Sequence, residues 1–567
     1  MTHFTQIDID QAFVPKDTPM FSDLIARIGE DGGLKSTRRR DMISGLRRVA
    51  KAIGRAPQDV PCHGRWLQPR LAKIAPAALG LSIKTWQNAV SNARSAMAQA
   101  GIVERRINRI TDLSPEWQKL WASVLATGDK TLQPALCRFV HFLNNTNITP
   151  KKVRDPHAHA YLEALTCNEI SKSPQVSYRA AVNGWNLAVD RVPKWPKTRL
   201  SLESRQKVIK LPQDAFPVDF IQDLEALMTG FATPDPLAED GRTHALRPAS
   251  IDQYRRQLLR FASEVVHSGV PIAHIQSLAD LLQPDMVESG LRQMLLRNNN
   301  KSSAAISEVA SRLCNFSKII GQPDETQTNL HRLAQRLAVP AQKGMTPKNR
   351  DRLRVLQNDK TMQRLLNLPE HLFAHPPVGK ANAYTKALAR EDAVAIAILL
   401  VCPIRVKNLA GIHLERSLQR PGDGRVYLVV TEDNVKNGRP IEFELPKDLV
   451  RMIDRHLASR SPHMCPAGTS WLFPQRDGNK SISPNQLSAR IYKRVRKETG
   501  FDVNAHLFRH LAVMNWLDAN PGGYEVARRL LGHSDVSQTI SLYSGLEIKS
   551  ATRAFADLIE TKKGPRI

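Results

Sequence analysis

Cysteine is scarce in this 567-residue chain, and its six cysteines are scattered along it. None of them has the short spacing of a metal-binding pair, which argues against both a zinc site and a disulfide framework. Long apolar runs are missing too, because the longest candidate, residues 393–401, falls well short of the ~20 residues of a membrane span. The N-terminus lacks the basic and then apolar pattern of a signal peptide. We therefore expect a cytoplasmic protein with no membrane partner.

Acidic residues are few relative to basic ones. The chain has 54 Asp and Glu against 81 Lys and Arg, which gives a formal net charge of +27. This excess favours a polyanionic partner, because the release of counterions from phosphates drives binding. A ribosomal or membrane surface would fit the charge as well. Charge alone therefore indicates a class of partner and no activity.

The length of the chain predicts three or four domains. Apolar residues recur at helical spacing through its first part, which predicts small bundles of short amphipathic helices that are related to one another. We place these helical units at residues 1–110, 111–200 and 214–338. A basic linker and a leading helix are expected at 339–384, and a final domain at 385–567.

The final domain is expected to be rich in α-helix with a small antiparallel sheet. An apolar helix is predicted at residues 388–401, and two segments with period-two alternation predict strands near 426–430 and 441–445. The Asn-Gly pair in Lys436-Asn437-Gly438-Arg439 is typical of a hairpin bend between two such strands. Helices are predicted for most of the remaining sequence.

Two arginines and a lysine of this domain suit phosphodiester chemistry. A phosphodiester under attack gains negative charge on its nonbridging oxygens, and planar guanidinium groups bind those oxygens with paired, directional hydrogen bonds. Arg405 and Arg509 are the candidates. Lys436, at the hairpin bend, can donate a proton to a leaving oxygen. Taken singly, a lysine in a turn is more often an ordinary exposed residue.

Histidines and one tyrosine complete the candidate set. His506 lies three residues before Arg509 on a predicted helix, so the two share a face. His506 and His533 can bind phosphate oxygens or help move a proton, whereas we interpret His510 as a packing or supporting group that points elsewhere on the helix. Tyr543 is the candidate nucleophile, and its phenol needs a nearby proton acceptor and neighbouring cations. Each residue alone is more often structural, so their order and spacing carry the hypothesis.

That order resembles the active-site series of the tyrosine recombinase, or phage integrase, family. The resemblance covers roughly residues 380–547 and rests on Arg405, Lys436, His506-x-x-Arg509-His510, Leu531-Gly532-His533 and Tyr543. It implies a mostly α fold, in which tandem helical DNA-binding bundles form a C-shaped clamp on DNA and precede an α-rich catalytic domain with a small antiparallel sheet. One departure is Asn408, which stands where family members commonly have Glu or Asp.

The resemblance also implies a reaction. Tyr543 would form a 3′-phosphotyrosyl link and release a 5′-hydroxyl, with neither ATP nor a metal. Arg405 and Arg509 would hold the phosphate, Lys436 would act as general acid, and His506 and His533 would assist. The implied partners are double-stranded DNA, a homotetramer on two DNA sites and, in some systems, other recombinases or accessory proteins.

Several functions remain open at this stage. The leading one is a site-specific recombinase of a mobile element, an integrase or transposase that works at the nucleoid of a bacterial cytoplasm. A type IB topoisomerase-like or telomere-resolving enzyme would use the same residue set. A non-catalytic DNA-binding accessory protein on the same fold is the third reading. The DNA flanking the gene would distinguish among types of element.

Overall fold

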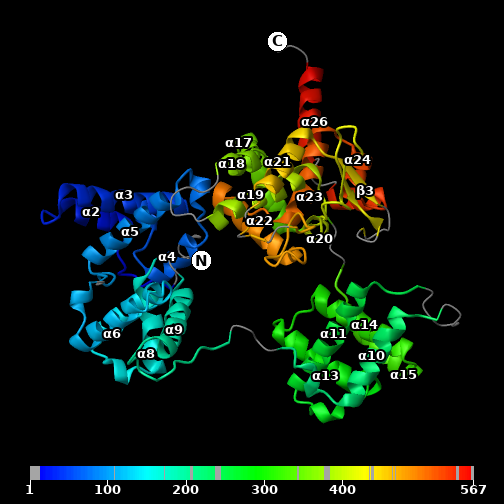
Figure 1. The fold of residues 1–567 in the computed structure, drawn as a ribbon, viewed down its shortest axis with the longest axis horizontal. Helices are drawn as coiled ribbons and strands as arrows, with labels where there is room; N and C mark the ends of the chain where they lie inside the picture. The colour runs from blue at the N-terminus through cyan, green and yellow to red at the C-terminus, as the bar shows by residue number, and fades with distance from the viewer. Residues whose placement is uncertain are drawn as a thin grey trace. The chain divides into compact units, whose positions relative to one another are not determined.

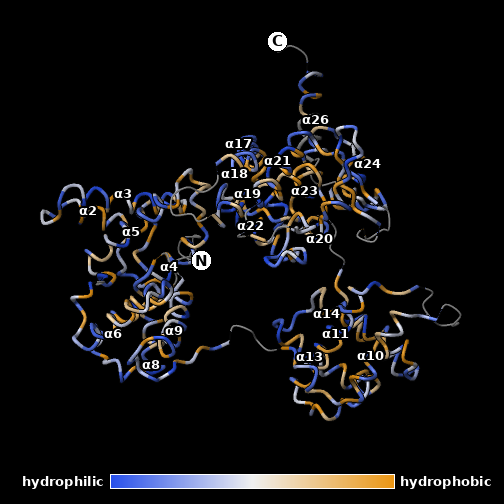
Figure 2. Tube along the Cα trace, viewed as in Figure 1, coloured by the Kyte–Doolittle hydropathy of each residue, from blue (hydrophilic) through white to orange (hydrophobic). Residues whose placement is uncertain are grey.

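The computed structural model describes residues 13–563 except for 107–108, 171–172, 205–208, 236–243, 341–343, 376–382, 433–434, 436–439, 461, 463, 466–467 and 544–547. The chain divides into two compact units, one of Met1–Leu202 with Gly344–Ile567 and one of Glu203–Lys343 (Figure 1). Hydrophobic and hydrophilic segments alternate along the helices of both units, as expected of helices with one buried face (Figure 2). The described part of the chain is mostly α-helical with one small antiparallel sheet, which confirms the predicted fold class.

The first bundle surrounds a core that includes Trp66. Its helices are α2 (Phe21–Glu30), α3 (Ser36–Ile53), α4 (Gly64–Leu71) and α5 (Ile83–Gln99). Helices α3 and α5 pack closely at Gly45, where a Cβ atom would lie 2.8 Å from the carbonyl oxygen of Ala89. Gly54 ends α3 in the left-handed conformation, as its position in the sequence predicts. The close packing holds α3 against α5, so the basic residues of α3 lie on the outer face of the bundle.

The second bundle has an aromatic core. It consists of α6 (Pro115–Ala126), α7 (Leu132–Asn145), α8 (Asp155–Asn168) and α9 (Pro174–Arg191). Trp117 and Trp185 are buried, and their indole N–H groups donate to the carbonyl oxygens of Ile148 at 2.9 Å and Thr198 at 2.8 Å. These hydrogen bonds satisfy the polar atom of each ring, so the rings are buried without an unpaired donor.

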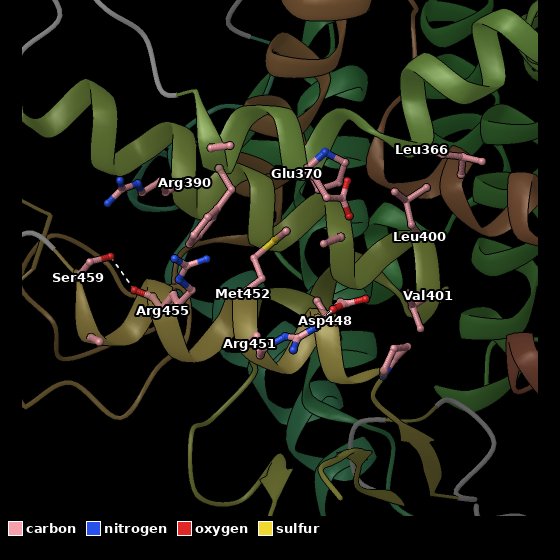
Figure 3. Close-up of a pocket in the computed structure, with 17 residues that line it drawn as sticks. Leu366, Glu370, Arg390, Leu400, Val401, Asp448, Arg451, Met452, Arg455 and Ser459 are labelled. Atoms are coloured by element: carbon pink, nitrogen blue, oxygen red, sulfur yellow. Dashed lines mark hydrogen bonds and ion pairs between the residues drawn. The ribbon is translucent and has the colours of Figure 1, made fainter.

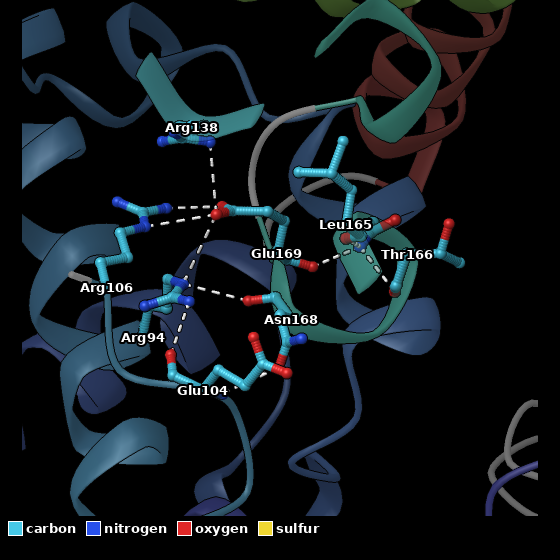
Figure 4. Close-up of polar contacts among 9 residues, drawn as sticks. Arg94, Glu104, Arg106, Arg138, Leu165, Thr166, Asn168 and Glu169 are labelled. Atoms are coloured by element: carbon cyan, nitrogen blue, oxygen red, sulfur yellow. Dashed lines mark hydrogen bonds and ion pairs between the residues drawn. The ribbon is translucent and has the colours of Figure 1, made fainter. Parts of the chain in front are cut away.

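A buried carboxylate joins the two bundles. Glu169 is 4% exposed and lies 2.5 Å from Arg106, 3.3 Å from Arg138 and 3.8 Å from Arg94 (Figure 4). Arg94 comes from α5 and Arg138 from α7, so one side chain connects an element of each bundle. Removing one partner of such a buried group leaves charges without compensation and costs about 3–5 kcal/mol.

The unit of Glu203–Lys343 is a third helical bundle. It contains α10 (Val218–Ala232), α11 (Pro248–His267), α12 (Leu278–Leu281), α13 (Pro284–Arg297), α14 (Ala304–Ile319) and α15 (Asp324–Leu337). Its core includes Phe220 and Phe261. The fully buried Glu264 of α11 accepts a hydrogen bond from Arg297 of α13 at 2.7 Å. The sequence analysis did not anticipate α12 or α15.

The C-terminal part begins with helices where the sequence suggested a basic linker and a leading helix. Residues 347–374 form α16 (Pro347–Leu356), α17 (Asp359–Leu366) and α18 (Leu368–Ala374). Leu353 and Leu356 are buried in the core of the C-terminal domain. The positive charge of this segment therefore lies on a helix with one apolar face. The many arginines of the segment obscured the helical spacing of its apolar residues in the sequence. The bounds of the five predicted segments remain predictions.

The remaining helices and strands form the domain that carries the candidate site. They are α19 (Ala383–Val401), α20 (Val406–Ala410), β1 (Leu418–Gln419), β2 (Tyr427–Val430), β3 (Ile441–Glu444), α21 (Lys447–Ala458), α22 (Pro484–Thr499), α23 (Ala505–Ala519), α24 (Tyr524–Leu531), α25 (Val536–Tyr543) and α26 (Ile548–Lys563). The strands pair antiparallel in the order β1-β2-β3, with Leu428 opposite Leu418 and Phe443. No helix in the described part of the chain combines the length and apolarity needed to cross a membrane.

Buried charges hold the central helix of this domain. Glu391 and Asp392 of α19 are 1% and 2% exposed. Arg490 of α22 donates to Glu391 at 2.8 Å and to Asp392 at 2.7 Å, and Arg494 donates to Asp392 at 2.9 Å. Burial raises the pKa of Glu391, which the nearby Arg490 charge opposes. These ion pairs fix the register between α19 and α22, and α19 leads directly to Arg405.

Candidate active site

Arg509 is the centre of the candidate site. It lies on α23 and is 6% exposed, and its guanidinium donates to the carbonyl oxygens of Pro403 and, at 2.8 Å, Leu531. Pro403 is two residues before Arg405, and Leu531 is two residues before His533. Arg509 therefore ties both of these candidate residues to its own helix. An arginine has five N–H donors, so Arg509 keeps donors for a phosphate beyond these two bonds.

Arg405 is fixed by its place in the backbone. It is the N-cap residue of α20, with extended backbone angles, and its side chain is half-buried. Its charge lowers the pKa of His506, Arg509 and His533, which places it in the electrostatic neighbourhood of all three. Burial is the largest cause of the lowered pKa of Arg509, which falls to about 10, and Arg405 is the second. Two guanidiniums in one partly buried site repel each other, so a bound anion would relieve that repulsion.

Histidine 506 lies next to this pair on α23. The helix starts at the N-cap Asn504, whose side chain accepts a hydrogen bond from the backbone N–H of Leu507 at 2.9 Å. The His506 side chain is exposed, yet its pKa is lowered by desolvation on its protein side and then by the charges of Arg509 and Arg405. A neutral, accessible imidazole beside two cations can donate one hydrogen bond to a phosphate oxygen.

Glycine 532 sets the direction of His533. It ends α24 in the left-handed conformation (φ +62°), and a Cβ atom at this position would overlap the side chain of Ile441 on β3. His533 follows, and its Nδ1 atom lies 3.0 Å from the hydroxyl of the buried Thr539. Burial, then the charges of Arg509, Arg405 and Arg528, lower the pKa of His533 to about 4. The Leu-Gly-His motif thus combines a helix end with a tight contact to the sheet.

The candidate nucleophile is buried. Tyr543 ends α25, a helix that the sequence analysis did not anticipate, and its side chain is 1% exposed. Burial raises the pKa of its phenol, while the nearby Arg509 charge opposes that shift. Its oxygen lies 2.8 Å from Nδ1 of His510. The phenol is therefore protonated and hydrogen-bonded in the structure.

His510 is the residue whose place the sequence analysis misjudged. It does not point away from the other candidates, because its ring contacts the ring of His506 at 4.8 Å between centroids and that of Tyr543 at 5.4 Å. Positions four apart on a helix differ by only about 40° around the axis, so His506 and His510 share a face. The four-residue spacing of His506 and His510 in the sequence therefore indicates that the two rings lie on one face of the helix.

The structure brings five of the six predicted site residues into one neighbourhood. These are Arg405, His506, Arg509, His533 and Tyr543, and the pKa values of the last four respond to at least one arginine of the set. Lys436 lies outside the described residues. Within the described ranges, no group of His, Cys, Asp or Glu is arranged to hold a metal ion, and all six cysteines are free.

A cavity of the C-terminal domain lies apart from these residues. It has a volume of about 1110 Å³ and lies between α18, α19 and α21 (Figure 3). Phe373, Leu400, Val401 and Met452 form apolar parts of its lining, and Arg390 and Arg455 add positive charge. Its lining includes none of the predicted catalytic residues, so its size says nothing about catalysis.

Comparison with known families identifies the C-terminal part. Residues 363–548 match the phage integrase family. This segment contains every described residue of the candidate site, from Arg405 to Tyr543. The C-terminal part of the chain is therefore a phage integrase catalytic domain. Phage integrases are tyrosine-type site-specific recombinases, so this domain of the chain is of the tyrosine recombinase type.

Solved structures of recombinases are similar to parts of this chain. The XerH site-specific recombinase bound to difH in a pre-cleavage complex is 12% identical, with a TM-score of 0.36, 54% of this chain covered and 79% of that one. A lambda integrase dimer bound to a core site is 13% identical, with a TM-score of 0.34 and coverage of 56% and 96%. The Tn1549 transposon integrase with transposon right end DNA is 14% identical, with a TM-score of 0.33 and coverage of 55% and 95%. No curated protein sequence matches the chain.

The structural role of Gly532 leads to a first prediction. We expect Gly532→Ala to lower thermal stability and to slow covalent attachment to DNA about tenfold or more, because a Cβ atom strains the left-handed backbone by ~1–2 kcal/mol and displaces Ile441 or His533. Gly522→Ala is the matched control, since Gly522 has φ +79° and no atom within 4 Å of the added Cβ. It should lose similar stability and keep its cleavage rate. Equal cleavage rates in both variants would contradict this role of Gly532.

Proposed function

We propose that this recombinase is the integrase or transposase of a mobile genetic element. It cuts and rejoins double-stranded DNA through a 3′-phosphotyrosyl intermediate on Tyr543. The observation that carries the proposal is the gathering of Arg405, His506, Arg509 and His533 in one neighbourhood with this phenol. Such a cluster offers fixed cations and hydrogen-bond donors where the phosphorane develops its charge. Strand exchange on the nucleoid of a bacterial cytoplasm follows from this role.

Each residue has a proposed part in the reaction. Arg405 and Arg509 bind the nonbridging oxygens, and Arg509 is held rigid by its bonds to two backbone carbonyls. His506 and His533 assist by hydrogen bonding, and Lys436 protonates the leaving 5′-oxygen. Tyr543 attacks phosphorus. Because its side chain is 1% exposed, attack requires a shift of α25 or of the residues that cover it when DNA binds.

The first bundle supplies a further surface for DNA. Arg40, Arg47, Arg48 and Lys51 are exposed on α3. They border a hollow of about 580 Å³, and a second hollow of about 520 Å³ lies beside it between α3 and α5. Among the described residues, Arg47, Arg48 and Lys51 have no carboxylate partner within ion-pair distance, so their charge is available to phosphates. We assign this face to backbone contacts outside the cleavage site.

The C-terminal helix supplies a surface for assembly. Phe555, Leu558 and Ile559 of α26 are 63%, 48% and 37% exposed, and their spacing places them on one face. The cavity lined by Phe373 and Met452 offers an apolar surface of matching character on the catalytic domain (Figure 3). We assign this cavity to α26 of a neighbouring copy, which supports a homotetramer on two DNA sites. Other recombinases or accessory proteins would join through the same surfaces.

Substitution of the nucleophile tests the function. A nicked suicide duplex made from the DNA that flanks the gene traps a covalent adduct, and we expect Tyr543→Phe to abolish the adduct while DNA binding changes little, because only the phenolic oxygen is lost. Tyr427→Phe, in strand β2, is the control and should form adduct normally. Denaturing gels measure the adduct, and equal yields from Tyr543→Phe and the wild type would defeat the proposal. With two intact duplexes, recombinant joints are expected, whereas relaxed circles or hairpin ends would indicate a topoisomerase or a telomere-resolving enzyme.

Salt dependence tests the basic face of α3. The double variant Arg47→Ala/Arg48→Ala should reduce the slope of log affinity against log salt by about 2, one unit for each lost phosphate contact. Arg191→Ala/Arg199→Ala removes the same charge from the second bundle, where Arg191 is 2.7 Å from Asp129 and Arg199 is 2.5 Å from Asp190. The control should change the slope less. An unchanged slope in the α3 variant would remove this face from the DNA interface.

Assembly on two sites tests the role of α26. We expect Phe555→Glu/Leu558→Glu to bind a single site with wild-type affinity but to form few complexes that hold two duplexes, because a charged side chain opposes burial against the apolar part of the cavity lining. Mass photometry of the protein–DNA complexes measures both states. Glu560→Gln, on another part of the same helix, is the control. Normal two-site complexes in the double variant would show that α26 does not join neighbouring copies. The helix would then pack elsewhere, for example in the cavity of its own chain.

A further inference from the structure

The hydrogen bond between His510 and Tyr543 has no part in the reaction as described so far. The Nδ1 atom of His510 lies 2.8 Å from the phenolic oxygen, within the range of a good hydrogen bond. The two side chains are 4% and 1% exposed, so water does not compete for this contact. Of the residues that the structure describes, His510 is the one whose side chain holds the oxygen of the candidate nucleophile.

The surroundings decide which partner donates. His510 faces His506 and Arg509 from its own helix, His533 from the turn after α24, and Tyr543 from α25. Burial, then the charges of His506, Arg509 and His533, lower the pKa of His510 to about 4. Burial raises the pKa of Tyr543, so the phenol keeps its proton. A protonated phenol and a neutral imidazole give an O–H group that donates to an unprotonated Nδ1, with the imidazole proton on Nε2.

The other two histidines are less suited to accept that proton. The Nδ1 atom of His533 lies 3.0 Å from the hydroxyl of Thr539. His506 is exposed beside the two arginines, where it can reach a phosphate oxygen. Neither is paired with the phenol among the described contacts, whereas His510 contacts the atom that reacts.

We propose that His510 is the general base of the cleavage step, accepting the phenolic proton of Tyr543 through Nδ1 as the tyrosine oxygen attacks phosphorus. This inference rests on the proposed function, since it concerns the same nucleophile. His510 is a catalytic residue in this assignment because it touches the reacting oxygen. It keeps this bond as the phenol moves onto the phosphate.

The cleavage step forms one bond to phosphorus and breaks another, with one proton transferred at each oxygen. The bond from the Tyr543 oxygen to phosphorus forms, the phenolic O–H bond breaks and its proton passes to Nδ1 of His510. The bond from phosphorus to the 5′-oxygen breaks, and that oxygen takes a proton from the general acid. In strand joining the 5′-hydroxyl attacks the phosphotyrosine and its proton returns to the general acid. The bond from phosphorus to the Tyr543 oxygen breaks, and His510 returns its proton to the departing phenolic oxygen.

Substrate binding raises the basicity of His510. Burial is the largest cause of the lowered pKa of His510, and the charge of Arg509 is another. A phosphodiester brings one negative charge next to Arg509, and this charge offsets the part of the lowering that comes from the guanidinium. The acceptor therefore becomes stronger when the nucleophile is needed and stays weak without DNA. A base used in this way contributes about 10²–10⁴-fold to the rate.

Two variants separate proton transfer from positioning. Single-turnover adduct formation is followed on the nicked duplex between pH 6 and pH 9, for the wild type, His510→Ala and His510→Asn. The asparagine side chain can still accept a hydrogen bond from the phenol, but it does not take up a proton. We expect both variants to be about 10²–10⁴-fold slower at pH 7, with rates that rise about tenfold per pH unit because solvent must then remove the proton. The wild-type rate should vary little over this range.

Further measurements guard against simple misfolding. DNA affinity and melting temperature identify variants that fold, and added imidazole should restore part of the rate of His510→Ala. Uniform replacement of tyrosine by a fluorotyrosine, whose phenol is more acidic, should accelerate His510→Ala more than the wild type, because a more acidic phenol depends less on a base.

The outcomes distinguish this inference from the proposed function. A rate within about threefold of wild type with the same pH profile in His510→Ala overturns the general base, and so does faster cleavage, which would show that His510 restrains the phenol. A near-wild-type rate in His510→Asn also overturns it and leaves only positioning. Adduct formation by Tyr543→Phe defeats the proposed function itself, whereas slow His510 variants beside an inactive Tyr543→Phe support both.

Discussion

One side chain holds the catalytic neighbourhood together. Arg509 donates to the carbonyl oxygens of Pro403 and Leu531, which precede Arg405 and His533. These carbonyls belong to segments more than a hundred residues apart, and each would be left without a partner if the guanidinium moved away. The arginine that is proposed to hold the phosphate is thus also the arginine that builds the site. A structural arginine of this kind keeps its geometry while DNA comes and goes, which is what electrostatic stabilisation of a transition state requires.

The positive charge of the site is costly without its ligand. Burial and Arg405 together lower the pKa of Arg509 to about 10. Burial and then nearby positive charge, including that of Arg509, lower the pKa values of His510 and His533 to about 4. Elsewhere in the chain, buried arginines are paired with carboxylates. Glu169 pairs with three arginines, and Asp392 pairs with Arg490 and Arg494. In the candidate site, Arg509 binds two backbone carbonyls, and none of the described salt bridges joins it to a carboxylate. The missing negative charge is the one that a DNA phosphate would bring.

Burial of the nucleophile follows from the same arrangement. Tyr543 packs in the hydrophobic core of its domain while its oxygen reaches His510, so the proposed nucleophile is also a core residue. The apolar surroundings keep the phenol protonated in the absence of DNA, which protects the chain from reacting without a target. If Tyr543 is the nucleophile as proposed, DNA binding has to move α25 or the residues that cover it before the phenol can reach phosphorus.

The sequence by itself determined the fold class, the family and the order of the candidate residues. Local signals in the sequence also mark the ends of some helices, as in α22, where Ser483 caps the first turn and Gly500 ends the helix. Only the tertiary structure decided that α16 buries Leu353, that β1 joins the sheet and that His510 meets Tyr543. These depend on which distant segment packs against a helix face. Helical spacing fixes the direction of a side chain, but its partner is chosen by the fit of the whole core.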